Sequence, residues 1–598
     1  MALLDTALGD AANVVTITSG TGLIANGSNI ANKLTLTNAN SLSSSNLSTA
    51  ANTILKGTGS INGNTTISGK HTPGNSIGTQ IITGDYTLAS GSALEIEINN
   101  TSSDKIDVRG AGNLVSIAND ANIIIKPLSR IDDTTSYDII TINGNLTDLA
   151  SFAATSGLIN SADDIERNAS EDLTDASVAS WVRGSLGAQL NFVDTSGDIV
   201  ANASDAAALR LTVNRLSSLV QTPGLGSNQS TVANLLESES LPSGLSQVVG
   251  GIQGMPESSQ SQALGSLLPE TNGGRIQSTA LVVGSFSELV FNRLSGTGTG
   301  GGVSSGDELE GDLNSGSYGF WLDYISSAIK QGERNGFDGY KFDYLGYAFG
   351  VDKEYGDELT IGAAIGYITG DVSGSGASVI NKTALETYQA SLYSSYDYGE
   401  FSILGQLSFA WNEYNSARDL TSISAGTAKA EYSGQYYKGQ IRIIDNLDLG
   451  GGLELKPEAG LSYGYINISD YDEKCSSAGL SVDGQNYSSL ESRFGSKLGL
   501  GEYEISGLEK KVSPRVHGYW SHEFIEGNYE TSSKFNGTTT VFQTKSAKPS
   551  TEKYNLGIGA DITSSFSGDK WKLSLTYDAE IKESYLGQTL LLKFKNKF

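Results

Sequence analysis

The sequence predicts a mainly all-β protein: a C-terminal 12-stranded antiparallel transmembrane β-barrel, an N-terminal right-handed parallel β-helix (solenoid) and a short helical linker with a pore-threading α-helix. Three observations predict this class. The C-terminal half alternates apolar with polar or small residues in about twelve runs. The N-terminal part has short apolar runs between glycine- and asparagine-rich corners, and a helical period separates the two parts. The predicted domains are residues 1–160, 161–272, 273–316 and 317–598.

Composition restricts the function classes. The chain of 598 residues has 39 basic and 66 acidic residues, and its net charge of −27 disfavours binding to nucleic acid. Cys475 is the only cysteine, so no intramolecular disulfide is expected. No apolar run is long enough for a transmembrane helix, so a membrane location depends on the barrel. The segment Met1–Asp5 has neither a basic region nor an apolar core, so we expect a signal peptide and further sequence upstream of it.

Residues 1–160 contain short β runs, such as Val14–Ile17, Leu94–Ile98 and Ile123–Ile125, at irregular spacings. A parallel β-helix stacks such strands as rungs, and each rung buries its apolar strand against the next. A β-sandwich would show similar strands and remains the alternative.

Residues 161–272 have helical periodicity. Apolar residues recur every three or four positions at Ala206, Leu209, Val213, Leu216 and Val220, which predicts an amphipathic helix. Shorter helical pieces are expected at about 231–236, 244–251 and 258–268, with prolines between them.

A longer helix is predicted for residues 273–294, immediately before the barrel. Twenty-two helical residues extend about 33 Å, which is enough to cross a hydrocarbon layer of about 30 Å. Four polar side chains would be costly in lipid but acceptable inside a pore: Arg275, Glu288, Asn292 and Arg293. Gly284 and Ser285 are small enough to let the helix fit a lumen. A surface helix packed on its neighbours is the alternative, and the glycine- and serine-rich residues that follow, to 316, are expected to form an acidic tether.

The barrel strands of residues 317–598 have one apolar and one polar face. In the sixth strand Lys438 and Arg442 lie opposite the apolar face, as Glu491, Arg493 and Lys497 do in the eighth. A lysine or arginine that faces lipid at the bilayer midplane costs roughly 2–4 kcal/mol, so these charges are expected in a wet lumen. Long polar connections alternate with short turns, as in outer-membrane barrels. A soluble all-β domain that uses the apolar face as its core is the alternative.

The last strand carries Leu590, Leu592, Phe594 and Phe598 on one face, and the chain ends at Phe598. This ending, together with the segments 388–393 (YQASLY), 405–408 (GQLS), 456–463 (KPEAGLSY) and 520–524 (WSHEF), resembles the autotransporter β-domain of type V secretion. Asn596 departs from the family pattern. The segment Thr72–Thr79 (TPGNSIGT) resembles a signature of pertactin-like β-helix passengers of the same family.

The resemblance implies a function for the whole chain. It implies a Gram-negative outer-membrane autotransporter whose monomeric barrel translocates and displays its own passenger, an adhesin or surface antigen that binds a host-cell surface receptor. The implied partners in assembly are periplasmic chaperones, outer-membrane lipid and the barrel-assembly machinery, which would recognise Leu590, Leu592, Phe594 and Phe598.

No catalytic, cofactor or metal site is predicted. Gly74-Asn75-Ser76-Ile77-Gly78 matches the letters of a nucleophile elbow, but strand rather than helix is expected after it. His71 is the only histidine before the barrel, and His517 and His522 fall on opposite faces of one strand. The alternative functions are an outer-membrane-anchored hydrolase, either a protease or an esterase, and a porin-like channel.

Overall fold

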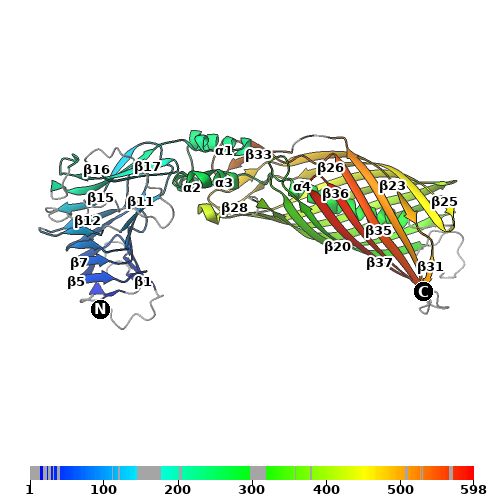
Figure 1. Cartoon of the computed structure of the whole chain (residues 1–598), viewed down its shortest axis with the longest axis horizontal. Helices are drawn as coiled ribbons and strands as arrows, with labels where there is room; N and C mark the ends of the chain where they lie inside the picture. The colour runs from blue at the N-terminus through cyan, green and yellow to red at the C-terminus, as the bar shows by residue number, and fades with distance from the viewer. Residues whose placement is uncertain are drawn as a thin grey trace. The chain divides into compact units, whose positions relative to one another are not determined.

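A computed structural model gives the architecture of the chain (Figure 1). It describes residues 14–17, 23–24, 29–30, 33–36, 41–110, 112–118, 121–143, 177–200, 205–295, 318–356, 358–376, 380–505, 510–525, 527, 529–564 and 570–597. The chain divides into two compact units. The N-terminal unit comprises residues 1–264 with 423–425, and the C-terminal unit comprises 265–422 with 426–598. Among the described residues, no α-helix has both the length and the hydropathy that crossing a lipid bilayer requires.

Two stacks of parallel strands form most of the N-terminal unit. One sheet runs in the order β1 (Val14–Ile17), β4 (Lys33–Leu36), β6 (Ile54–Gly57), β8 (Lys70–Pro73), β11 (Ala93–Ile98) and β14 (Asn122–Pro127). The other runs β13 (Val115–Ile117), β10 (Tyr86–Leu88), β7 (Ser60–Ile67), β9 (Thr79–Ile82), β12 (Lys105–Arg109) and β15 (Thr135–Asn143), and β5 (Ser41–Thr49) joins β7 to β2 (Leu23–Ile24) and β3 (Asn29–Ile30).

Parallel pairing places like residues above one another in this unit. Leu34, Leu55, His71, Leu94 and Ile123 are successive partners along the first sheet. Leu55, Leu94 and Ile123 are almost fully buried. The stack therefore forms a continuous apolar ladder with one histidine in it.

The helix predicted for residues 206–220 is wrong, because this region contains strand β18 (Ala208–Arg215). It pairs antiparallel with β15 and with β17 (Leu186–Val193), which in turn pairs with β16 (Ser177–Arg183). Leu209, Leu211 and Val213 are buried, while the residues between them are partly exposed. Apolar residues at 209 and 213 fit both a helical and an alternating period, and pairing with two neighbouring strands selects the strand.

The shorter helices match the prediction. They are α1 (Ser227–Ser238), α2 (Ser243–Gln253) and α3 (Glu257–Ser266), and a 3₁₀ turn at Leu219–Gln221 precedes them. The next helix is α4 (Gly274–Ser295), which belongs to the C-terminal unit.

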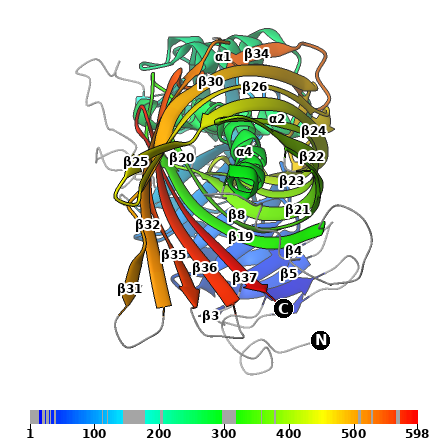
Figure 2. The ribbon, with the colours of Figure 1, turned by 90° about the vertical axis from the view of Figure 1, so that its right-hand side faces the viewer.

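The predicted twelve-strand antiparallel barrel is confirmed. Its strands are β19 (Tyr318–Gln331), β20 (Tyr340–Tyr355), β21 (Leu359–Gly374), β22 (Asn381–Tyr398), β23 (Phe401–Asp419), β24 (Gly426–Asp445), β26 (Leu453–Ile468), β30 (Gln485–Gly499), β32 (Lys510–Glu523), β35 (Glu552–Ser564), β36 (Lys570–Lys582) and β37 (Tyr585–Lys597). Each strand pairs with the next, and β37 pairs with β19 to close the ring. Figure 2 shows this ring with α4 inside it.

The two ends of the barrel differ. The long-loop end carries the connections 332–339, 375–380, 420–425, 469–484 and 524–551, together with the tight link 583–584. The short-turn end is where β20 meets β21, β22 meets β23, β24 meets β26 through residues 446–452, β30 meets β32 and β35 meets β36. At the Tyr398–Glu400 turn, Gly399 has a φ of 65°, a left-handed conformation that glycine adopts without strain.

The two longest connections contain strands where only polar loops were expected. They form a four-stranded sheet of β27 (Tyr471–Asp472), β29 (Leu480–Val482), β33 (Glu530–Phe535) and β34 (Phe542–Lys545). A further strand, β28 (Lys474–Ser476), pairs with β24 and contains the exposed Cys475. At the short-turn end, β25 (Leu447–Gly450) pairs with β26 and β31 (Tyr503–Ile505) pairs with β32.

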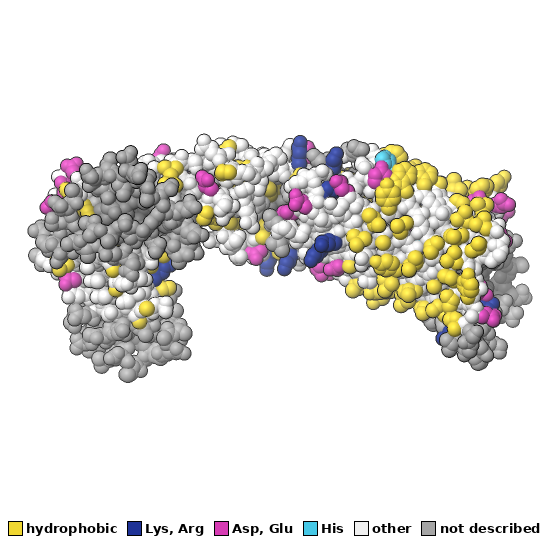
Figure 3. Space-filling view, in the orientation of Figure 1, with side chains coloured by type: hydrophobic (Ala, Val, Ile, Leu, Met, Phe, Trp, Pro, Cys, Tyr) yellow, Lys and Arg dark blue, Asp and Glu magenta, His cyan; other side chains and the backbone are white. Residues whose placement is uncertain are grey.

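The outer face of the barrel is apolar. Ile365, Leu392 and Leu407 are each more than 60% exposed, which would be costly in water. Hydrophobic side chains cover the barrel strands in the space-filling view, and charged side chains gather at the edges of this band (Figure 3). Such a band is the surface that outer-membrane barrels present to lipid.

Candidate functional site: the barrel lumen and its helix

Helix α4 lies along one side of the lumen and packs against β20, β21, β22, β23 and β24. Its first residue, Gly274, lies close to Tyr340 and Val372 at the long-loop end. Arg293, near its last residue, bonds Asp352 close to the short-turn end. The helix therefore runs from the long-loop end to the short-turn end, and the residues before it leave the lumen at the long-loop end.

Small residues on the inner face of β21 make room for the helix. A Cβ added at Gly366 would lie 2.2 Å from the ring of Phe286, which is fully buried. On the same strand, Ile361 and Ile365 point outward. The alternation in β21 thus separates a lipid-facing row of branched side chains from an inner row that accepts an aromatic ring of α4.

Arg275 anchors the first turn of α4. Its guanidinium donates to the hydroxyls of Tyr432 at 2.8 Å and Tyr471 at 3.1 Å, and to Oε1 of Gln485 at 2.9 Å. It also lies over both tyrosine rings, 5.4 and 5.6 Å from their centroids. Tyr471 lies in the long connection 469–484 and Gln485 directly follows it, so these contacts join the helix to the mouth of the barrel.

Glu288 joins the middle of α4 to the barrel wall. Its carboxylate accepts from Arg442 Nη1 at 3.1 Å and from Arg493 Nη1 at 3.1 Å. Glu458 lies beside the same two guanidiniums, with its Oε1 3.3 Å from Arg442 Nη1 and 3.1 Å from Arg493 Nε. Two carboxylates therefore neutralise two guanidiniums in one four-membered cluster.

The last turn of α4 has a second ion pair. Arg293 donates through Nε and Nη2 to the two carboxylate oxygens of Asp352, both at 2.9 Å. Tyr393 donates to the same carboxylate at 3.1 Å and accepts from Trp321 Nε1 at 2.8 Å. A bidentate pair of this kind fixes the axial position of the helix as well as neutralising its charge.

The other predicted helix residues face the open part of the lumen or its wall. Ser285 bonds the hydroxyl of Tyr344 at 2.6 Å, and Gly284 lies close to Lys438. The side chain of Asn292 is exposed to the cavity.

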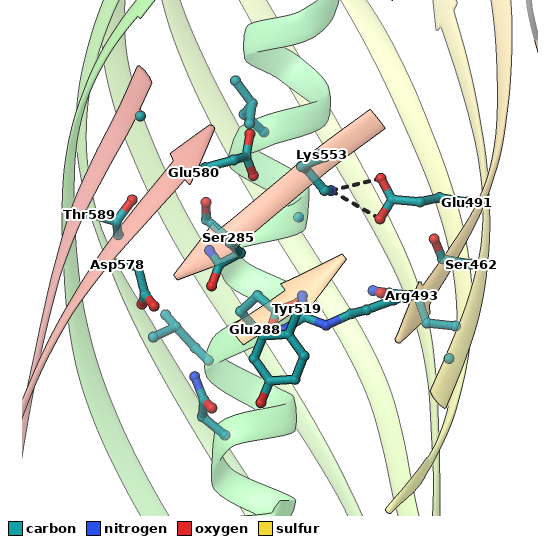
Figure 4. Close-up of a pocket in the computed structure, with 18 of the residues that line it drawn as sticks. Ser285, Glu288, Ser462, Glu491, Arg493, Tyr519, Lys553, Asp578, Glu580 and Thr589 are labelled. Atoms are coloured by element: carbon teal, nitrogen blue, oxygen red, sulfur yellow. Dashed lines mark hydrogen bonds and ion pairs between the residues drawn. The ribbon is translucent and has the colours of Figure 1, made fainter. Parts of the chain in front are cut away.

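A cavity of about 990 Å³ remains beside α4, and all five predicted lumen charges line it: Lys438, Arg442, Glu491, Arg493 and Lys497. Figure 4 shows Glu491 and Lys553 in direct contact beside the helix, at the edge of this space. The ammonium nitrogen of Lys553 lies 3.0 Å from Oε1 and 2.7 Å from Oε2 of Glu491.

Three residues that form ion pairs with the predicted ones were not identified from the sequence. They are Asp352, which pairs with Arg293, Glu458, which pairs with Arg442 and Arg493, and Lys553, which pairs with Glu491. The alternation of their strands places each on an inner face, so this signal was present in the sequence. Which charges meet across the lumen depends on strand register and on the position of the helix.

The predicted assembly signal lies on the last strand. Leu590 and Leu592 point outward, 45% and 42% exposed. Phe594 is in β37 opposite Leu573, and Phe598 lies outside the described residues.

The serine elbow suggested by Gly74–Gly78 does not meet the nearby histidine. Ser76 is exposed, whereas His71 is fully buried and bonds Tyr86 at 2.8 Å and Gln80. Burial lowers the pKa of His71 from 6.5 to about 4, so this imidazole is neutral in the folded state at neutral pH. The segment Gly74–Gly78 connects β8 to β9, and the backbone N–H of Gly78 donates to Oδ1 of Asp104 at 2.9 Å.

Solved structures similar to the chain include the translocator domain of the autotransporter NalP from Neisseria meningitidis, with 14% identity, a TM-score of 0.39, and coverage of 54% of this chain and 98% of that one. The transport unit of the autotransporter AIDA-I from Escherichia coli has 13% identity and a TM-score of 0.34, and the match covers 49% of this chain and 93% of that one.

Curated relatives match the C-terminal half. Outer membrane protein A of Rickettsia rickettsii is 25% identical over 311 residues, which are 50% of this chain and 13% of the relative. Outer membrane protein B of Rickettsia japonica is 26% identical over 308 residues, 50% of this chain and 18% of the relative. A more distant match, at 20% over 284 residues, is an extracellular serine protease of Serratia marcescens, covered over 26% of its length. The chain thus spans less than a fifth of the rickettsial proteins.

The family model of the autotransporter beta-domain matches residues 320–578. This range runs from the first barrel strand into β36, and it includes Tyr344, Asp352, Arg442 and Arg493, which bond α4 in its middle and last turns. The C-terminal region of this chain belongs to the autotransporter β-domain family and forms a barrel of the bacterial outer membrane.

Proposed function

We propose that this protein is an autotransporter whose barrel carries its own N-terminal unit across the outer membrane and displays it on the cell surface. The observation that carries the proposal is the course of α4, which threads a closed barrel and leaves it at the long-loop end. In outer-membrane barrels the longer loops are extracellular. The N-terminal unit, which precedes α4 in the chain, would then be outside the cell.

The displayed passenger, in this proposal, is a right-handed parallel β-helix. Support comes from the two stacks of parallel strands and from the apolar ladder that runs through the strands of the first sheet. A solenoid of this kind offers a long lateral surface, which suits an adhesin or surface antigen that binds a host-cell surface receptor.

A non-enzymatic passenger fits the chemistry of this unit better than a hydrolase does. His71 is engaged with Tyr86 and Gln80 inside the strand stack, which leaves Ser76 without that base. The Rickettsia relatives are named as outer membrane proteins, whereas the Serratia relative is named as a serine protease. A hydrolase, either a protease or an esterase, is therefore the second candidate, and a porin-like channel is the third.

Assembly would follow the terminal strand. We propose that periplasmic chaperones deliver the barrel and that the barrel-assembly machinery recognises Leu590, Leu592, Phe594 and Phe598. Leu590 and Leu592 point to the outer face of β37, where lipid or a templating strand would meet them. Because β37 pairs with β19, the ring has no open edge and acts as a monomer.

Surface proteolysis of intact cells tests the proposal. One epitope tag is placed in the N-terminal unit near Gly197, and a control tag is placed in the short-turn connection near Gly451, both of which have positive φ in exposed turns. We expect added protease to remove the first tag from intact cells and to reach the second only after permeabilisation. Protection of the N-terminal tag in intact cells, with cleavage after permeabilisation, would place this unit in the periplasm and contradict display.

A further inference from the structure

The helix fills only part of the lumen. It packs on the wall from β20 to β24, while the cavity lies mainly between the helix and the rest of the wall, from β26 round to β19, with part of β24 at its edge. Its lining includes Gly452 and Glu502 at the short-turn end and Tyr529 and Ser550 at the long-loop end. The open space therefore extends along the whole barrel, beside a helix that remains in place.

Ion pairs neutralise most of the charges around this space. Glu288 and Glu458 balance Arg442 and Arg493. Glu491 balances Lys553, and Glu580 lies 2.8 Å from Lys582. Among the described residues, two lysines, Lys438 and Lys497, remain without a carboxylate partner. One carboxylate of the lining, Glu523, is held by the hydroxyl of Ser489 and by two backbone N–H groups instead of a cation.

Four basic side chains gather on the inner faces of β26, β30 and β32 toward the short-turn end. Lys497 on β30 lies directly opposite Lys456 on β26 and opposite His517 on β32. Arg515 precedes His517 by two residues and shares its face of β32. All four line the same cavity. Like charges directly opposite each other on neighbouring strands destabilise a sheet.

The nearby carboxylates are already engaged. Glu454 lies 3.3 Å from Lys456, Asp561 pairs with Arg515, and Asp578 pairs with His517. Among the described residues, no carboxylate pairs with Lys497. Within the described part of the chain, Lys438 also has no carboxylate in an ion pair with it. This lysine lies closer to the long-loop end, beside Gly284.

We propose that Lys456, Lys497 and Arg515 form a binding site for a small inorganic anion, within an aqueous path that stays open beside α4. The ammonium of Lys497 supplies the charge that no protein group neutralises, and Lys438 supplies a second cationic position along the same path. Basic side chains that line a pore favour anions, and here three of them lie on adjacent strands on one side of the lumen. The assembled barrel, with its helix in place, then conducts small ions and prefers chloride to potassium. This activity goes beyond passenger transport and does not depend on display.

Planar-bilayer recordings of the full chain test the proposal, with the reversal potential measured across a gradient of potassium chloride. We expect a chloride-to-potassium permeability ratio above one for the wild type. Lys497→Glu should lower this ratio by about two- to fivefold, because it replaces the unpaired cation by an anion in a narrow path. Lys497→Gln should give an intermediate value.

The matched control is Lys474→Glu, which makes the same charge change on an exposed lysine of β28 outside the cavity lining. It should leave the ratio at the wild-type value. The proposal is overturned if the wild type does not conduct, if its ratio is at or below one, or if Lys497→Glu and Lys497→Gln both keep the wild-type ratio. Heat-modifiable mobility in gels shows whether each variant has folded, and the neutral variant serves if Lys497→Glu has not.

Discussion

At the scale of single residues, Glu288 is the side chain that connects helix and wall most extensively. It contacts Arg442 and Arg493, whose side chains are only 6% and 15% exposed, while its own is 34% exposed. Part of its interaction is therefore screened by water in the lumen. We expect Glu288→Gln to lower the free energy of unfolding by about 1–2 kcal/mol, because two guanidiniums are left with one carboxylate.

Thermal unfolding in detergent, followed by circular dichroism, measures this effect. Asn292→Ala is the control, because Asn292 lies one turn further along the same helix with an exposed side chain. High salt should reduce the difference between Glu288→Gln and wild type. Equal losses for Glu288→Gln and Asn292→Ala would show that the cluster contributes nothing specific.

His71 is a second residue with a measurable consequence, in the N-terminal unit. Its folded pKa of about 4 lies below the unfolded value of about 6.5, so only the unfolded chain gains a proton between these values. The contribution of His71 to the free energy of unfolding of this unit should therefore fall by about 2 kcal/mol as the pH drops from 6.5 to 4.5.

Amide hydrogen exchange of β8 to β11 in the full chain, corrected for the intrinsic pH dependence of exchange, measures this contribution as the difference between the wild type and His71→Leu. The comparison is needed because burial raises the pKa of Asp104 to about 7, and its titration acts in the opposite direction in both proteins. His71→Leu continues the aliphatic ladder and cannot titrate, so its protection should be lower at neutral pH but lack this pH-dependent fall. The same pH-dependent fall in both proteins would exclude His71 as its source.

At the scale of elements, the fit between α4 and β21 depends on a missing side chain. Gly366→Val would push a branched side chain into the ring of Phe286, and overpacking of this kind costs about 1–3 kcal/mol. The control is Ala363→Val on the same strand, because Ala363 is exposed on the outer face. Thermal unfolding should distinguish the two.

The double variant with Phe286→Ala sharpens the test. If the clash is with that ring, Gly366→Val should cost less in the Phe286→Ala background than in the wild type. Strict additivity of the two changes would mean that the valine strains the strand itself.

At the scale of the whole molecule, α4 occupies a large part of a closed lumen. Deleting residues 274–295 should increase the single-channel conductance severalfold, because the current then passes through the full lumen rather than the remaining cavity. A porin-like channel, in contrast, would conduct equally well with and without the helix. Unchanged conductance of a folded deletion variant would therefore favour the porin reading over the autotransporter.

Much of the barrel could be predicted from sequence, because alternation alone assigns each strand an inner and an outer face. Lys438, Arg493 and Lys497 line the lumen as their parity requires. Leu209 and Val213 show the limit of such patterns, since their spacing also fits a helix and only pairing with β15 and β17 decides for a strand.

Local periods and the cost of charges in lipid are enough to predict the twelve strands, the alternation of long and short connections and the polar character of α4. The contacts of Glu288 with Arg442 and Arg493, the packing of α4 against β20 to β24, and the lack of a carboxylate partner for Lys497 among the described residues are known from the folded chain alone. These features could not be predicted because the partner of a luminal charge depends on strand register around a closed ring and on the position of a helix inside it. Neither quantity has a signal in the local sequence.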